Sequence, residues 1–160
     1  MIDALALDLE YTLIYNVDRP IPRPYLYEFL DFCFSNIPHV VLFTGIRNHV
    51  AMEVLYNLGR RRHIPIEASN MHVIRWNRVI RGEWQKKDLK YVQQVHLGAR
   101  LDHIYLVDDI EEFVLPSQRN QWIRIDPFRI QGDDVLKNTD NELVRIQHIL
   151  EEKLKKSIFD

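Results

Sequence analysis

The sequence has little of three features that would point to particular classes of protein. Cys33 is its one cysteine among 160 residues, so an internal disulfide is excluded and a buried structural thiol is expected there. No apolar run approaches the ~18 residues that span a bilayer, and the first residues lack a basic, cleavable signal pattern. The formal net charge is −2, so no strong field draws the chain to nucleic acid or a membrane surface. These absences favour a protein of the reducing cytoplasm.

The composition is that of a folded globular protein. Hydrophobic residues make up 46% of the chain and charged residues 28%, which is far from the composition of disordered segments. A chain of 160 residues is long enough to bury a full core. We therefore expect one domain over residues 1–160, without repeats or a linker.

Short apolar runs alternate with segments of helical spacing. Strands are expected over residues 4–7, 39–43 and 104–107, with a weaker candidate over 121–125. Helices are expected over residues 25–35, 49–58, 87–96, 110–114 and 141–156. This alternation predicts an α/β fold, in which right-handed crossovers build a parallel sheet that helices cover on both faces.

Two segments interrupt the alternation. Residues 16–24 contain three prolines and must form an extended loop. Residues 72–84 alternate apolar and polar side chains and include Gly82, so they predict a β-hairpin insert over about 70–84. Trp76 and Trp84 are expected to form the core of this small sheet, with binding of a peptide by exposed aromatic rings as the alternative. Neither segment leaves room for a large cap domain, which predicts an open site.

Polar side chains follow three of the expected strands. They are Asp8, Thr44 and the pair Asp108-Asp109. In doubly wound sheets, ligands bind beyond the carboxyl ends of the strands, where these residues would converge. Carboxylates gathered at one edge repel unless a cation neutralises them, and Mg²⁺ prefers such oxygen ligands. We expect Mg²⁺ to be held by Asp8, Asp108, Asp109 and Glu10, the last through its backbone carbonyl.

Such a site can transfer a phosphoryl group. Asp8 could attack phosphorus and form an aspartyl-phosphate. The hydroxyl of Thr44 and the amide of Gly45 could donate hydrogen bonds to the phosphoryl oxygens. A lysine should complete the electrostatic cage, and Lys87 is preferred to Lys86 for this role.

The residues around these positions resemble the haloacid-dehalogenase (HAD) superfamily. The likeness is to its NIF-like, or small C-terminal-domain phosphatase (FCP/SCP-type), branch, which dephosphorylates serines in RNA polymerase II tails and other proteins. The motifs that carry it, in order, are Leu7-Asp8-Leu9-Glu10-Tyr11-Thr12-Leu13, Arg23-Pro24, Phe43-Thr44-Gly45, Arg81-Gly82-Glu83-Trp84, Lys87-Asp88-Leu89 and Val107-Asp108-Asp109-Ile110.

This resemblance implies a Rossmann-like HAD core and a Mg²⁺-dependent phosphomonoester hydrolase acting through Asp8. Glu10 stands where the family has its acid/base aspartate and is expected to act as the catalytic acid/base, and Asp109 stands where the family has asparagine. A carboxyl group one methylene farther out is misplaced on the ~1 Å scale that can cost ~100-fold in rate. The alternative is therefore a catalytically impaired binding module that recognises a protein or a phosphorylated ligand.

The expected substrate is a phosphorylated protein or another exposed phosphomonoester. An open site would also admit a nucleic-acid 3′-phosphate, but the net charge of −2 counts against nucleic acid, and no membrane partner is expected. The run Arg60-Arg61-Arg62-His63 is either a solvated helix end or a docking patch for an acidic or phosphorylated partner. The oligomeric state and the particular substrate stay open.

Overall fold

Five parallel strands form the central sheet of the computed structural model, which describes residues 1–130 and 139–156. In sheet order they are β3 (His72–Arg75), β2 (His39–Thr44), β1 (Ala4–Leu7), β6 (Ile104–Asp108) and β7 (Trp122–Arg124). Every neighbouring pair runs parallel. The expected α/β fold with a parallel sheet is confirmed.

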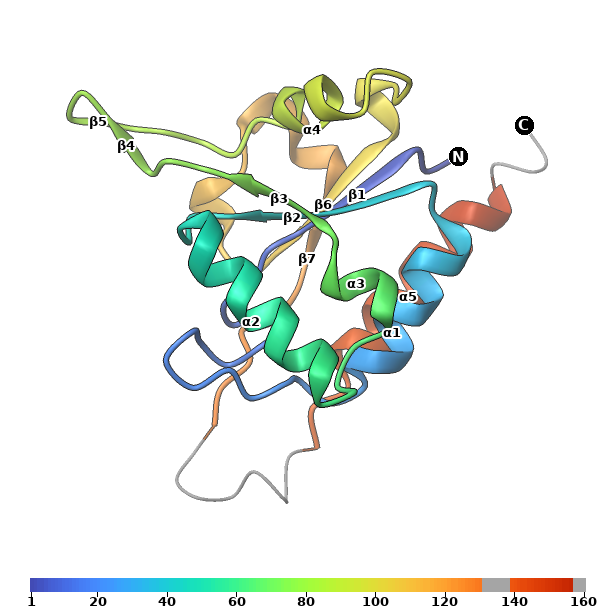
Figure 1. Cartoon of the computed structure of the whole chain (residues 1–160). Helices are drawn as coiled ribbons and strands as arrows, with labels where there is room; N and C mark the ends of the chain where they lie inside the picture. The colour runs from blue at the N-terminus through green and yellow to red at the C-terminus, as the bar shows by residue number, and fades with distance from the viewer. Residues whose placement is uncertain (131–138, 157–160) are drawn as a thin grey trace.

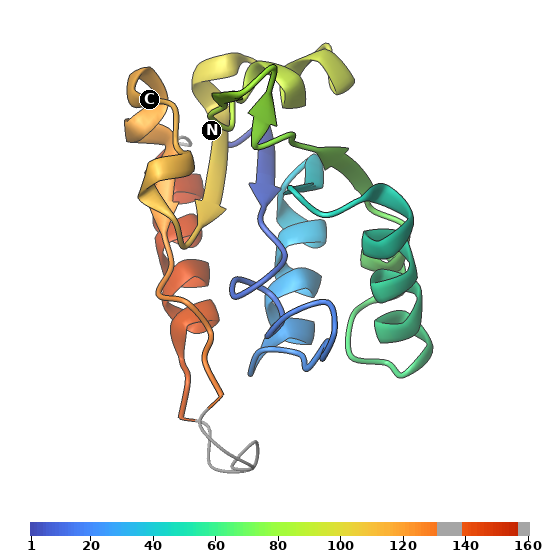
Figure 2. The same cartoon turned by 90° about the vertical axis from the view of Figure 1, so that its left-hand side faces the viewer.

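Helices cover both faces of this sheet (Figures 1 and 2). Leu5 and Leu7 of β1 face one hydrophobic core, and Ala4 and Ala6 face the other, as the alternation of side chains in a strand requires. The first core also contains residues of α1 (Leu26–Asn36), α2 (Asn48–Arg60), α3 (Ile66–Ser69) and α5 (Glu142–Lys156). The second contains residues of and around α4 (Lys90–Val95).

The helices follow their apolar spacing. In α5, Leu143, Ile146 and Leu150 recur at intervals of three and four residues and are buried. Cys33 of α1 is also buried, as expected. Short 3₁₀ helices complete the chain: η1 (Leu101–His103), η2 (Glu111–Phe113) and η3 (Pro116–Gln121). Within the described residues, no helix combines the length and apolar character needed to cross a membrane.

Two expected helices are shorter than their spacing indicated. Segment 87–96 becomes helical only at Lys90, and in the irregular chain before it the Asp88 carboxylate accepts a hydrogen bond from the Lys90 amide at 3.0 Å. Segment 110–114 forms only the 3₁₀ turn η2. Both segments are therefore free to lie as irregular chain beside the ends of β1 and β6.

The prediction of a hairpin over residues 72–84 was wrong in its first half. His72–Arg75 is the outer strand β3, which pairs parallel with β2, and only β4 (Val79–Ile80) and β5 (Glu83–Trp84) form the hairpin. Alternating side chains fit either arrangement, so the pattern could not separate them. Arg81 and Gly82 turn the hairpin with positive φ angles of 52° and 81°. Figure 1 shows it projecting beyond the ends of the strands.

The two tryptophans of this region have opposite environments. Trp76 is 3% exposed and belongs to the core beside α4, whereas Trp84 is 74% exposed. The expectation that both would form a small core of their own was therefore wrong. The physical reason is size, because a hairpin with two residues in each strand cannot cover an indole ring.

A buried arginine ties the loop after β1 to the C-terminal part of the chain. Nε and Nη2 of the Arg23 guanidinium each donate to one oxygen of the Asp140 carboxylate at 2.9 Å. The same group donates to the carbonyls of Tyr11 at 3.3 Å, Thr12 at 3.1 Å and Asp126 at 2.6 Å. The Arg23 side chain is fully buried, so these partners replace all of its hydration. The loop that bears Glu10 is thereby fixed.

Replacing Arg23 should weaken the fold strongly. Arg23→Met removes the cation that faces the Asp140 carboxylate and the donor to three carbonyl groups, and removing one partner of a buried ion pair costs about 3–5 kcal/mol. We expect a loss of this size in the free energy of unfolding, measured by urea denaturation. Arg19→Met is the matched control, because Arg19 belongs to the same loop and is exposed. A loss below about 1 kcal/mol for Arg23→Met would contradict this role.

Candidate active site

Asp8 lies at the centre of the carboxyl edge of the sheet. It follows β1 directly, and its amide donates to the carbonyl of Val107 at 3.0 Å, which continues the pairing of β1 with β6. Its side chain is 14% exposed. The Thr12 hydroxyl lies 3.5 Å from Oδ2 of Asp8. The expected nucleophile is therefore held by main-chain pairing, with one carboxylate oxygen toward Thr12.

Lys87 links this carboxylate to the end of β6. Its ammonium lies 2.8 Å from Oδ1 of Asp8 and 2.5 Å from Oδ2 of Asp108. The Lys87 amide donates to the carbonyl of Phe113 at 2.7 Å, which fixes the segment before α4 against the segment after β6. Burial lowers the pKa of Lys87, but the charges of Asp8 and Asp108 outweigh burial and raise it. Lys87 is therefore a permanent cation at this edge.

Asp108 and Asp109 complete a group of three carboxylates. Asp108 is fully buried, and its Oδ1 accepts a hydrogen bond from the Ile110 amide at 2.9 Å. Burial, and then the charge of Asp8, raise the pKa of Asp108 to about 7. The same two causes raise the pKa of Asp109 to about 6. One ammonium is shared by two of these carboxylates, so the site keeps an excess of negative charge.

The three carboxylates suit a hard divalent cation. One oxygen each of Asp8, Asp108 and Asp109 lies within 4.8 Å of the others. Oxygen donors of this charge and number are the ligands that Mg²⁺ takes, and a cation would relieve the repulsion that raises the two pKa values. The residues present therefore fit the expected cofactor. The side-chain carboxylate of Glu10 lies outside this group of oxygens.

Thr44 and Gly45 lie where β2 ends. Thr44 is 2% exposed, and its hydroxyl oxygen accepts from the Ile46 amide at 3.2 Å. The hydroxyl hydrogen can still be donated to a bound group. Helix α2 has Arg47 at its N-cap, so Thr44 does not cap it. The turn that holds Thr44 and Gly45 is therefore available for binding rather than committed to the helix.

Glu10 lies beside Asp8 and is held by its own loop. Its Oε2 accepts a hydrogen bond from the Val17 amide at 2.9 Å. The next residue, Tyr11, has a φ of 61°, a left-handed conformation that turns the chain back after Glu10. The longer side chain is therefore accommodated by a fixed main-chain donor, and it still lines the same cavity as Asp8.

A small cavity of about 190 Å³ joins these groups. Its walls are Asp8, Glu10, Tyr11, Thr44, Gly45, Ile46, Trp76, Arg78, Asp109, Ile110 and Phe113. Lys87 and Asp108 lie buried behind it. Sequence reasoning missed Arg78, Phe113 and Tyr11 as wall residues. A hint was available only for Arg78, as a cation in the insert that precedes Lys87.

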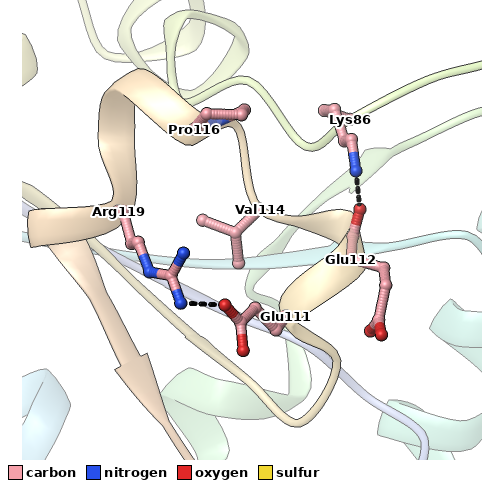
Figure 3. A pocket seen from close by; sticks show the side chains of 6 residues that line it. All are labelled: Lys86, Glu111, Glu112, Val114, Pro116 and Arg119. Atoms are coloured by element: carbon pink, nitrogen blue, oxygen red, sulfur yellow. Dashed lines mark hydrogen bonds and ion pairs between the residues drawn. The ribbon is translucent and has the colours of Figure 1, made fainter.

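A larger pocket lies apart from this chemistry. It measures about 450 Å³ and is lined by Lys86, Glu111, Glu112, Val114, Pro116 and Arg119 (Figure 3). Arg119 pairs with Glu111, and the Lys86 ammonium donates to the carbonyl of Glu112. Lys86 therefore points away from the carboxylates that Lys87 reaches. The choice of Lys87 as the lysine of the site agrees with this geometry.

The parallel sheet and the aspartates and lysine at its carboxyl edge define a member of the HAD superfamily. Residues 4–160 match the NLI interacting factor-like phosphatase family, and the chain belongs to that family. It is also 28% identical over 138 residues to the CTD phosphatase-like protein 355R of Invertebrate iridescent virus 6. That match covers 82% of this chain and 74% of the viral protein. Membership points to a phosphatase of the HAD type.

Binding of Mg²⁺ should weaken as the pH falls. Below the raised pKa values of Asp108 and Asp109, the cation must displace protons, which costs up to about tenfold in affinity per proton and pH unit. We expect the Kd for Mg²⁺ to rise about tenfold or more from pH 8 to pH 6. Calorimetry in two buffers of different ionisation enthalpy should show proton release.

The control for this measurement is Asp102→Asn, because Asp102 has an 81% exposed side chain outside the site. It should bind Mg²⁺ like the wild type at both pH values. Asp108→Asn should bind more weakly and with less proton release. A pH-independent Kd in the wild type would contradict the raised pKa of Asp108.

Proposed function

We propose that this chain is a Mg²⁺-dependent phosphomonoester hydrolase that works through an aspartyl-phosphate on Asp8. The observation that carries the proposal is the buried Lys87 ammonium, 2.8 Å from Asp8 and 2.5 Å from Asp108, beside the Thr44 turn. Few structural roles require a lysine buried between two carboxylates at the open edge of a sheet. Electrostatic stabilisation of a phosphoryl group does.

In the first step, an oxygen of Asp8 attacks phosphorus. The bond between this oxygen and phosphorus forms as the ester bond breaks, and the leaving oxygen takes a proton from Glu10. In the second step, water attacks the phosphoryl group and gives a proton to Glu10. Asp8 is released as a carboxylate together with inorganic phosphate. Glu10 returns to its starting state, so protons balance over the cycle.

The other residues stabilise charge during these steps. Lys87 fixes the orientation of Asp8 and offsets the negative charge around it. The Thr44 hydroxyl and the Gly45 amide donate to the phosphoryl oxygens. Asp8, Asp108, Asp109 and the backbone carbonyl of Glu10 would hold Mg²⁺, which supplies positive charge against the phosphoryl oxygens when bound.

The substrate class that fits is a phosphorylated protein. The cavity is only about 190 Å³, enough for a phosphoryl group and its linkage but not for a large enclosed metabolite. The rest of such a substrate must lie on the surface beside the projecting hairpin. Family membership and the likeness to a CTD phosphatase-like protein also support a phosphoprotein.

Asp8→Asn should abolish hydrolysis. The amide can still accept a hydrogen bond from Lys87, but it is a poor nucleophile. We expect activity on p-nitrophenyl phosphate and on a phosphoserine peptide to fall to the rate without enzyme. EDTA should do the same to the wild type. Asp18→Asn, an exposed aspartate of the following loop, should keep full activity. A wild type as inactive as Asp8→Asn, yet able to bind Mg²⁺, would contradict the proposal and indicate a binding module.

Glu10→Gln should lower kcat with little change in stability. The glutamine oxygen can still accept the Val17 amide, but it cannot exchange a proton, and general acid–base catalysis contributes about 10²–10⁴-fold. We expect a fall of about 100-fold or more in kcat, with thermal unfolding unchanged. Glu10→Asp keeps a carboxylate and should retain more activity than Glu10→Gln. Glu28→Gln, on the exposed face of α1, is the control. Equal activity of Glu10→Gln and wild type would exclude the acid/base role.

A further inference from the structure

Arg78 is a cation at the cavity wall that has no carboxylate partner. Among residues 1–130 and 139–156, its guanidinium takes part in no ion pair and no hydrogen bond, although it is exposed and close to several acids. Its recorded contacts are with aromatic rings. The guanidinium carbon lies 4.8 Å from the centre of the Phe113 ring and 5.9 Å from that of Trp76. Its donors are therefore available while its position is held.

This position is directly over the turn at the end of β2. A Cβ atom placed on Gly45 would lie 3.4 Å from Nε of Arg78 and 3.6 Å from the Trp76 ring. Arg78 thus lies against the same Thr44–Gly45 turn that offers donors to a phosphoryl group. Both Arg78 and Asp8 line the one small cavity of about 190 Å³. A group bound to Asp8 would therefore lie in the same small cavity as Arg78.

The charges of the cavity explain why a second cation is needed. Lys87 is 1% exposed, and two of its three donors are taken by Asp8 and Asp108. Three acidic residues, Asp8, Glu10 and Asp109, line the cavity. Lys87 and a bound Mg²⁺ would together carry three positive charges against the carboxylates of Asp8, Glu10, Asp108 and Asp109, so a phosphate dianion that enters still lacks a counter-charge. Arg78 is the one arginine among the cavity-wall residues that the structure describes.

Guanidinium chemistry matches this task. The planar fork of an arginine donates two parallel hydrogen bonds to two oxygens of one phosphoryl group, which a lysine ammonium cannot do. The cation–π contacts with Phe113 and Trp76 hold the guanidinium near the cavity before a ligand arrives, which lowers the entropy that binding would cost. A carboxylate partner would compete with the substrate, and none is present within the described part of the chain.

We propose that Arg78 is a catalytic residue that binds two non-bridging oxygens of the phosphoryl group at Asp8. This inference rests on the proposed function and names the residue that binds the substrate anion from the hairpin side. Arg78 makes this contact as the phosphoryl group enters and keeps it as negative charge shifts between the oxygens. Arg78 forms no covalent bond with the substrate and transfers no proton.

Arg78→Met separates this role from packing. Methionine keeps an apolar stem against Phe113 and Trp76 but removes the donors. Loss of one such donor group costs about 10²–10³-fold in rate, so we expect kcat/KM on p-nitrophenyl phosphate to fall about 100-fold. The Kd for inorganic phosphate, measured by calorimetry with MgCl₂ present, should rise about tenfold or more. Arg78→Lys should recover only part of both, because it restores the charge without the fork.

Two controls exclude a structural cause. Arg81→Met changes the neighbouring arginine at the tip of the same hairpin and should leave both measurements unchanged. Thermal unfolding of Arg78→Met should match that of the wild type. Arg78→Ala should also regain activity when guanidinium chloride is added at millimolar concentration, a rescue that a packing role would not produce.

The outcomes distinguish this inference from the proposed function. If the wild type hydrolyses the aryl phosphate but Arg78→Met equals it in kcat/KM and in phosphate Kd, the Arg78 inference is overturned and the hydrolase proposal stands. If the wild type binds phosphate through Arg78 without turnover, the inference stands and the hydrolase proposal is overturned. If the wild type neither binds phosphate nor hydrolyses, both are overturned.

Discussion

The contact between the Lys87 ammonium and the carboxylates of Asp8 and Asp108 is the constraint around which this site is built. Two carboxylates at the ends of neighbouring strands repel each other, and the repulsion is strong because Asp108 is fully buried. The ammonium offsets that repulsion only if the segment before α4 lies against the segment after β6, as the bond between the Lys87 amide and the Phe113 carbonyl ensures. The irregular chain before α4 and after β6 thus sets the electrostatics of the site, while Leu89 and Val114 of the same segments pack into the core.

Three positively charged side chains, Arg23, Lys87 and Arg78, differ in burial and in their contacts, and these differences determine what each one does. Arg23 is fully buried with all of its donors used, so it holds the loop after β1 in place. Lys87 is equally buried but shared between two acids, so it sets the electrostatics of Asp8. Arg78 is exposed and lies against aromatic rings and the Gly45 turn, and within residues 1–130 and 139–156 it has no carboxylate partner, which leaves its donors for a ligand.

The loop around Glu10, beside Asp8, accommodates a residue that differs from the family's aspartate. Glu10 carries one more methylene than the family's aspartate, and the Val17 amide holds its carboxylate. That amide is presented by a loop which the left-handed Tyr11 turns back and the Arg23 guanidinium anchors. The position of Glu10 therefore depends on contacts that reach as far along the chain as Asp140.

The sequence by itself determined the strands and the residues that end them. The runs over 4–7, 39–43 and 104–107 are apolar because parallel strands are buried on both faces, and Asp8, Thr44 and Asp108 follow them at the only edge where polar groups can face a ligand. The sequence was sufficient to predict these strands and the residues that end them, because each strand is a short continuous segment of the chain. The choice of Lys87 also followed from its place in a short motif.

Only the tertiary structure decided the features that join distant segments. Alternation over 72–84 could not show that His72–Arg75 extends the main sheet, because pairing with β2 is a long-range contact. Nor could it show that Trp76 enters the core while Arg78 rests against Phe113, some 35 residues away. The bonds of Arg23 to Asp140 and of Glu10 to Val17 depend likewise on how loops close in space. The local sequence pattern indicates which side chains are buried. The partners of a charged side chain depend on which distant segments the fold brings together.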